Sequence, residues 1–211
     1  MGPILCTCIG HLRDKNVHHL HIHCSPIFFI MYRLPAVDSL PSLTETAQIE
    51  VLDHLFEPCP TLTRFLLPRI FSVAYASYTA FIEAARSVLL TFLKEEEAKK
   101  TVTPKIAEII SAHPRLGPSK DKLSSHSTSE QKSLQGSAEE AAKLAELNRL
   151  YEETFPGLRY VVFVNGRSRE AIMENMAKRI ERNDICKERE EAFNAMCDIA
   201  LDRAAKLGAK L

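Results

Sequence analysis

The stretch YTAFIEAARSVLLTFLKEEEAKK, residues 78–100, decides the fold class of this chain of 211 residues. Apolar side chains recur in it every three or four positions, a spacing that gathers them on one face of an α-helix. The residues that share this face are Tyr78, Phe81, Ile82, Ala85, Leu89 and Phe92. The charged run from Lys94 to Lys100 closes the stretch as a solvent-exposed helix end. We therefore predict one long amphipathic helix here.

Helical patterns also precede this stretch. Ser42 and Glu45 have the spacing of a capping box, which predicts a helix start at that point. Pro58 predicts its end, because proline has no backbone N–H to continue a helix. A short apolar segment over residues 62–67 follows, and Pro68 is predicted to end it.

Similar signals follow the long helix. Thr103 before a proline predicts another helix start, and the pair His113-Pro114 predicts its end. Residues 117–129 are rich in polar and turn-forming types and are predicted to form a loop. Ser137 and Glu140 then make a second capping box, which predicts a further helix.

One segment departs from the helical pattern. β-branched and aromatic residues cluster in Tyr160, Val161, Val162, Phe163 and Val164, and Asn165-Gly166 after them signals a turn. Helical patterns then resume, with Ser168 as a predicted cap and a last helix over about residues 185–205. One isolated extended segment cannot make a sheet. The sequence therefore predicts an all-α fold, a compact single-domain bundle of about eight helices with one short extended segment at residues 160–164.

Composition limits the class of protein. With 45% hydrophobic residues the chain is long enough for one well-buried core, which indicates one domain over residues 31–208. Its 27 basic residues balance 27 acidic ones, so we expect neither nucleic acid nor a membrane surface as a partner. The six cysteines have no repeated spacing and are interpreted as reduced thiols of an intracellular protein. The apolar run over residues 26–31 is too short to span a bilayer.

Residues 1–30 differ in character from the rest of the chain. They hold a cluster of histidines and cysteines without helical or strand period: Cys6, Cys8, His11, His18, His19, His21, His23 and Cys24. We interpret these residues as a disordered extension, or as the product of a misassigned start codon with Met31 as the natural beginning. The alternative is a Zn²⁺ or Cu²⁺ site, since imidazole and thiolate are usual ligands. The spacing fits no compact zinc module, so no metal site is predicted.

His113 is the first candidate for chemistry. Pro114 follows it, and proline disfavours a helical conformation at the residue before it, so the imidazole is expected at the mouth of a helix. A titratable group there suits proton transfer near neutral pH. On spacing alone, a histidine that caps helix carbonyls is the more common arrangement, and the motif leaves both interpretations open.

A polar run and three arginines are further candidates. Ser127 and Glu130 have capping-box spacing, and a carboxylate fixed on the first turn of a helix can also orient a ligand. Arg167, Arg169 and Arg203 suit a substrate carboxylate, because a guanidinium offers two parallel donors, although surface arginines are the common alternative. No cofactor is predicted, because the chain has neither a glycine-rich phosphate loop nor a nucleophile elbow.

Several motifs in one order resemble a known family. They are His113-Pro114 with Leu116-Gly117, then Ser127-Thr128-Ser129-Glu130-Gln131 about 14 residues on, then Leu147-Asn148 with Tyr151 and Phe155, and late in the chain Ile199-Ala200 with Arg203. Together they resemble the 2-oxo-4-hydroxy-4-carboxy-5-ureidoimidazoline (OHCU) decarboxylases of urate breakdown, over roughly residues 33–207. The segment from Phe155 to Tyr160 is about one residue longer than the family pattern, and Cys59-Pro60-Thr61 stands where a Pro-Trp pair is common.

The resemblance implies a cofactor-independent helical enzyme, usually a homodimer, that removes CO₂ from the last unstable intermediate of urate breakdown and yields (S)-allantoin. It matches His113 to the catalytic acid/base, Pro114 to a neighbour that lines the pocket, and Arg203 to a catalytic arginine on the last helix that anchors negative charge. It matches the run Ser127, Thr128, Ser129, Glu130 and Gln131 to the ligand-binding segment. In that segment Glu130 orients the imidazole or substrate and Gln131 bonds the ring or ureido group. The backbone from Tyr160 to Val164 matches the extended segment that lines the site.

Two further expectations concern location and an alternative function. Ala209-Lys210-Leu211 is a close variant of the Ser-Lys-Leu peroxisomal address, so we expect recognition by a peroxisomal import receptor, or a cytoplasmic protein if the tripeptide is not read. The alternative function is a helical interaction protein that kept the fold and lost activity. It predicts damage at His113, Glu130 or Arg203, and all three are present.

Overall fold

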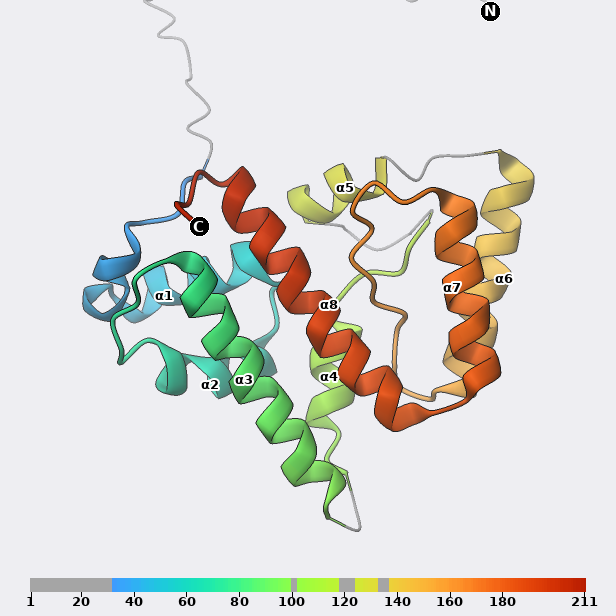
Figure 1. The fold of residues 1–211 in the computed structure, drawn as a ribbon, viewed down its shortest axis with the longest axis horizontal. Helices are drawn as coiled ribbons and strands as arrows, with labels where there is room; N and C mark the ends of the chain where they lie inside the picture. Colours follow the sequence, from blue (N-terminus) through green and yellow to red (C-terminus); the bar gives the residue numbers. More distant parts are fainter. Residues whose placement is uncertain (1–31, 100–101, 118–123, 133–136) are drawn as a thin grey trace, which may run out of the picture. The chain divides into compact units, whose positions relative to one another are not determined.

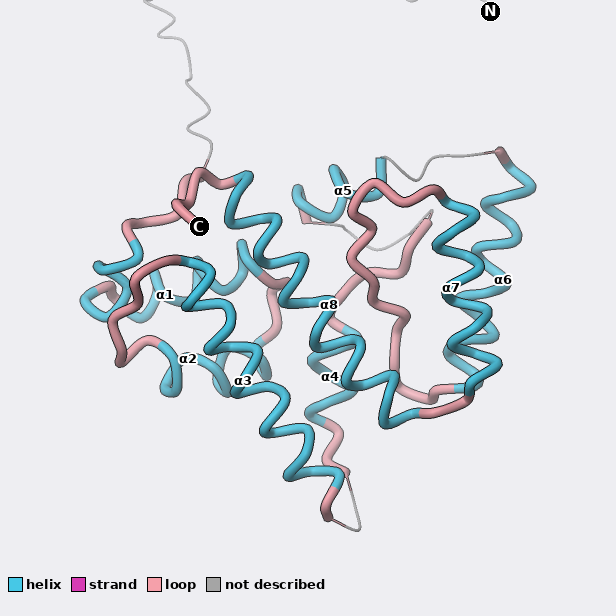
Figure 2. Tube along the Cα trace, viewed as in Figure 1, coloured by secondary structure: helices cyan, strands magenta, loops and turns pink. Residues whose placement is uncertain are grey.

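The computed structural model describes residues 32–99, 102–117, 124–132 and 137–211, and for residues 129–132 it describes the backbone alone (Figure 1). In these ranges the regular structure is helical and contains no strand (Figure 2). It comprises the short 3-10 helix η1 (Val37–Ser42) and the α-helices α1 (Glu45–Leu55), α2 (Pro60–Ile70), α3 (Tyr78–Glu97), α4 (Lys105–Ser111), α5 (Ser125–Lys132), α6 (Ala138–Thr154), α7 (Arg169–Arg182) and α8 (Ile185–Lys206). The prediction of an all-α fold with about eight helices is confirmed. Residues 1–30, interpreted above as an extension or a metal site, lie outside the described residues.

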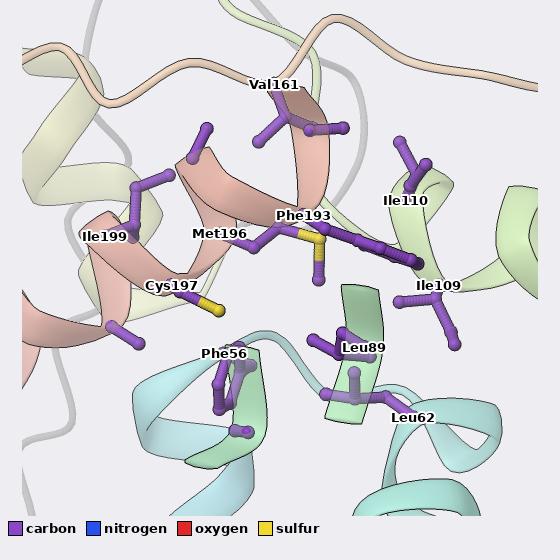
Figure 3. Close-up of a cluster of buried hydrophobic side chains, with 14 of the residues drawn as sticks. Phe56, Leu62, Leu89, Ile109, Ile110, Val161, Phe193, Met196, Cys197 and Ile199 are labelled. Atoms are coloured by element: carbon purple, nitrogen blue, oxygen red, sulfur yellow. The ribbon is translucent and has the colours of Figure 1, made fainter. Parts of the chain in front are cut away.

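Helix α8 lies at the centre of the hydrophobic core. It packs against α1, α3 and α4, while α2 contacts α1, α3 and α4. Figure 3 shows Phe193 and Met196 of α8 directed toward Leu89 of α3 and Ile109 of α4. The apolar face predicted for residues 78–92 is buried in this core, and its removal from water is the main term that stabilises such a bundle. None of the helices in the described residues is long and apolar enough to cross a membrane.

The extended segment has a geometric cause. Helices α6 and α7 pack on each other and run in the same direction in Figure 1, so the connection between them, residues 155–168, has to return along their length. Helix α6 has 17 residues, which span about 25 Å at the usual rise per residue. Roughly seven or eight residues of extended chain cover that distance. The predicted segment 160–164 lies within this return and pairs with no strand in the described residues.

The start of α1 differs from the prediction. Ser42 ends the 3-10 helix η1, and the cap of α1 is Thr44, whose Oγ1 accepts a hydrogen bond from the N–H of Ala47 at 3.3 Å. Both serine and threonine satisfy the local capping preference. Gln48 donates to the carbonyl of Leu40 at 3.0 Å, a contact between α1 and η1 that no local capping pattern contains.

Pro68 does not end its segment, because α2 continues to Ile70. A proline in the last turn forfeits one helical hydrogen bond, here the one to the carbonyl of Arg64. Ile70 is buried in the core, and this burial favours two more helical residues after the proline.

The charged run after Leu93 is less exposed than predicted. Glu96 is buried, and its carboxylate accepts hydrogen bonds from Lys99 and from the backbone N–H of Thr103. These bonds hold the pKa of Glu96 down to about 2. One carboxylate of the run therefore fastens the connection between α3 and α4 rather than facing solvent.

Candidate active site

Four parts of the chain surround a cavity of about 210 Å³: the turn after α4, helix α5, the segment after α6 and the last turns of α8. The residues that line it are His113, Pro114, Leu116, Ser127, Tyr160, Val161, Val162, Phe163, Val164, Asn165, Gly166, Ile199, Asp202 and Lys206. The cavity therefore brings together predicted site residues that are far apart in the sequence: His113, Pro114, Ser127 and the run from Tyr160 to Val164.

His113 lies in the wall of the cavity, immediately after α4. The helix ends at Ser111, and the backbone N–H of His113 makes a last turn with the carbonyl of Ile110 at 3.2 Å. Pro114 cannot continue the helix, as predicted, so the chain turns away. The carbonyl of His113 accepts a hydrogen bond from Arg159 at 3.2 Å. With 4% of its surface exposed, His113 is held in one place and faces the cavity rather than bulk water.

The run from Tyr160 to Val164 forms an apolar wall. The Tyr160 hydroxyl donates to Oδ1 of Asn175 at 2.5 Å, and burial raises the pKa of Tyr160 to about 12. The hydroxyl is therefore occupied within the wall and stays protonated at neutral pH. The wall ends in the predicted turn, where Asn165 and Gly166 have positive φ angles of 44° and 71°.

Ser127 brings α5 to the cavity. The prediction of a loop to residue 129 is wrong, because α5 starts at Ser125. Ser127 is not the cap of a helix either, since its own N–H donates to the hydroxyl of Ser124 at 3.1 Å. Ser127 is buried within α5, and its hydroxyl donates to Oε1 of Glu57 at 2.5 Å.

Arg203 is not among the lining residues, but it bonds to Ser127, which is. Its side chain is 1% exposed and belongs to α8. Its Nη2 donates to Oε1 of Glu57 at 2.7 Å and to the Ser127 hydroxyl at 3.3 Å, and its Nη1 donates to the carbonyl of Phe56. A buried guanidinium is tolerated only when a carboxylate and hydrogen bonds replace its water, and Glu57 supplies that carboxylate.

Other predicted residues lie elsewhere. Thr128 is exposed and donates to the carbonyl of Ser124 at 2.9 Å, so its hydroxyl does not line the cavity. Arg167 is exposed and folds back onto the carbonyls of Phe163 and Val164, and Arg169 is not among the lining residues. The side chains of Ser129, Glu130 and Gln131 lie outside the described residues, so their predicted roles stay predictions.

Three polar residues at this site were not predicted from the sequence. Glu57 follows the end of α1, where no local pattern marks it, and its partner Arg203 is 146 positions away. Asp202 and Lys206 line the cavity and form an ion pair of 2.5 Å with helical spacing. Ile199, Asp202 and Lys206 follow one another at helical spacing and so share one face of α8. This signal was present in the sequence.

The chemistry that the described residues offer is proton transfer and hydrogen bonding. Among them, no three histidine, cysteine or carboxylate side chains cluster as metal ligands do. The cavity instead combines the imidazole of His113, the hydroxyl of Ser127 and the ion pair of Asp202 and Lys206 with an apolar wall. This composition suits a small polar ligand that is held by a few directed contacts.

Comparison with known proteins gives two matches. A sequence model of the OHCU decarboxylase family matches residues 41–205, which include every described residue of the site up to Arg203. Among solved structures, a chain described as (S)-allantoin synthase is similar, with a TM-score of 0.56 and 14% sequence identity over 82% of this chain. The match covers 54% of that chain, so the present chain spans about half its length, and at this identity the likeness shows the fold. No curated protein sequence matches the chain.

Proposed function

Because the chain belongs to the OHCU decarboxylase family, we propose that it converts 2-oxo-4-hydroxy-4-carboxy-5-ureidoimidazoline to (S)-allantoin and CO₂. One observation carries the proposal: the buried imidazole of His113 faces a cavity that also holds Ser127 and the apolar wall of residues 160–164. These are the positions at which the family's motifs occur in the sequence.

The reaction breaks the bond between the carboxylate and the carbon that carries the hydroxyl. The electron pair of that bond needs an acceptor, and the imine and carbonyl groups of the substrate ring provide one, so no cofactor is needed as an electron sink. The hydroxyl loses its proton and becomes a carbonyl, while the ring imine nitrogen and the neighbouring carbon, which carries the ureido group, each gain a proton. The net reaction consumes one proton and releases CO₂.

The protein's part is to place a proton carrier and orienting groups. We assign the proton transfer to His113, which accepts the hydroxyl proton. We place one face of the substrate against the wall of residues 160–164, which line the cavity, so that protonation from the other face gives one enantiomer. The proposed roles of Glu130 and Gln131 in orienting the substrate rest on the family motif. The homodimer and the peroxisomal location also stay predictions.

The test generates the substrate in place from urate, with the two upstream enzymes, and follows optically active allantoin by circular dichroism. The wild-type chain is expected to speed its formation. His113→Ala and His113→Asn are expected to lower the rate by about 100-fold or more, since neither side chain transfers protons at neutral pH. Equal far-ultraviolet spectra serve as the control for folding. Full stereospecific activity in either folded variant would show that His113 is not the proton carrier, and an inactive wild type would favour the interaction-protein alternative.

A further inference from the structure

Glu57 joins three parts of the chain at one buried carboxylate. It lies between α1 and α2 and is 6% exposed. Its Oε1 accepts hydrogen bonds from Arg203 of α8 at 2.7 Å, from Ser127 of α5 at 2.5 Å, and from Ser124 before α5 at 3.2 Å. A carboxylate this deep is stable only while such partners replace its water, so the three segments are fixed relative to one another.

The same contacts fix the direction of Arg203. Two consecutive residues hold its guanidinium, because the Phe56 carbonyl accepts from Nη1 and the Glu57 carboxylate accepts from Nη2. A guanidinium bound at two of its nitrogens has one orientation, since its donors lie in a rigid plane. The positive charge of Arg203 is thus matched by a negative charge inside the protein.

The contacts also decide what Ser127 offers to the cavity. A serine hydroxyl has one proton to donate and two lone pairs. An ionised carboxylate only accepts, so the Ser127 proton is directed to Glu57. One lone pair accepts from Arg203 at 3.3 Å. The remaining lone pair makes Ser127 an acceptor toward the cavity, which suits an N–H of a ring or ureido group rather than a carbonyl or carboxylate.

We propose that Glu57 is a positioning residue for the decarboxylation: it holds Arg203 and Ser127 so that α5 closes one wall of the cavity with an acceptor facing the substrate. The inference rests on the proposed function for its effect on the rate, and on the geometry alone for its effect on α5. Nothing in the family motifs quoted above includes this residue.

The test compares Glu57→Gln with Glu57→Asp. The first removes the charge at nearly constant shape, and the second keeps the charge of the ion pair but shortens the side chain by one methylene. Both are expected to lower kcat by about 10-fold to 100-fold, because small displacements of orienting groups have effects of this size. If the uncharged variant does not fold, the aspartate variant still carries the test.

Hydrogen–deuterium exchange gives a second readout that does not depend on activity. In either variant the amides of residues 125–132 are expected to exchange about 10-fold faster or more, because α5 loses an anchor. The matched control is Glu96→Gln, which removes a buried carboxylate that bonds Lys99 and Thr103 and does not line the cavity. It is expected to change stability without changing kcat or the exchange of α5.

The outcomes separate the two proposals. If His113→Asn abolishes activity and a folded Glu57 variant keeps the wild-type kcat and α5 protection, the assignment of Glu57 is wrong and the proposed function stands. If the wild-type chain is inactive but the Glu57 variants release α5, the proposed function is wrong while Glu57 still positions α5. Faster exchange with unchanged kcat would limit Glu57 to a structural role and overturn the inference.

Discussion

His54 is a half-buried residue of α1 that contacts His126 of α5. Its Nδ1 lies 3.0 Å from Nε2 of His126, and its ring stacks on Tyr32 with centroids 3.6 Å apart. Burial lowers the pKa of His54, and Arg203 adds to this, while Glu50 and Asp53 oppose it. The folded state therefore resists protonation of this imidazole more than the unfolded state does.

This shift predicts a pH dependence of stability. As the pH drops through the usual pKa of 6.5, the unfolded chain takes up a proton at His54 at a higher pH than the folded chain does, so stability falls. His54→Gln removes this contribution. We expect the drop in melting temperature between about pH 7.5 and about pH 5.5 to be smaller in the variant than in the wild type. Lys178→Gln, an exposed change on α7, should leave the drop unchanged. An equal drop in His54→Gln and wild type would contradict the prediction.

At the level of single residues, the sequence predicted those residues that a local motif identifies. His113 was visible because Pro114 ends a helix there, and Ser137 and Glu140 form the predicted capping box. Glu57 was not visible, because its importance comes from partners on α5 and α8. A buried ion pair depends on tertiary packing, and neither of its members has a local pattern that announces it.

At the scale of helices, a buried network fastens the cavity wall. Glu188 of α8 is fully buried and accepts from Arg179 of α7 at 2.8 Å, from the Tyr151 hydroxyl of α6 at 2.6 Å, and from Arg182. Arg179 also donates to the carbonyl of Val161 at 3.2 Å. The network thus joins three helices to the segment that lines the cavity.

Breaking this network at one member is expected to be costly. Glu188→Gln leaves Arg179 without its buried counter-charge, and we expect a loss of about 3–5 kcal/mol in the free energy of unfolding. Replacing the pair by Glu188→Leu with Arg179→Met should recover only part of this loss, since the apolar side chains need no counter-charge but the buried Tyr151 hydroxyl still loses its acceptor. Urea unfolding of the three proteins measures the differences. A single variant as stable as the wild type would show that the pair adds nothing to the stability of this helix cluster.

The sequence predicted that the helices are present, but it predicted less well where they start and end. The faces of α3 and α8 follow from apolar spacing alone, because burial repeats with the helical period. The continuation of α2 past Pro68 and the start of α5 at Ser125 depend on what the adjoining residues contact in the fold. Ile70 reaches the core and Ser127 reaches Glu57, and both contacts outweigh local signals that indicated a helix end or a loop.

For the whole molecule, the helical period predicted the class but not the arrangement. The central position of α8 and the direction of α6 and α7 follow from packing between distant segments. That arrangement explains the extended segment, which the sequence marked as β-like although it has no strand partner in the described ranges. The β-branched side chains at 160–164 fit an extended return between helices as well as they would fit a sheet.

The residue at which the folded domain starts can be tested by truncation. The segment just after Met31 contacts the start of α3 and the end of α8: the Tyr78 hydroxyl donates to the carbonyl of Pro35 at 2.9 Å, and the N–H of Leu34 donates to the carbonyl of Leu207 at 3.4 Å. A chain that starts at Met31 keeps these bonds, so we expect its melting temperature and activity to equal those of the full chain.

A chain that starts at Val37 loses both bonds and leaves the buried Tyr78 hydroxyl without the Pro35 carbonyl. Its free energy of unfolding should fall by about 1–3 kcal/mol, the usual cost of a buried polar group that loses its partner. Tyr78→Phe is the matched control, because it removes the hydroxyl instead of its acceptor and should make the truncation to Val37 cost less. If the chain that starts at Met31 were less stable than the full chain, residues 1–30 would contribute to the fold, and the predicted boundary at residue 31 would be wrong.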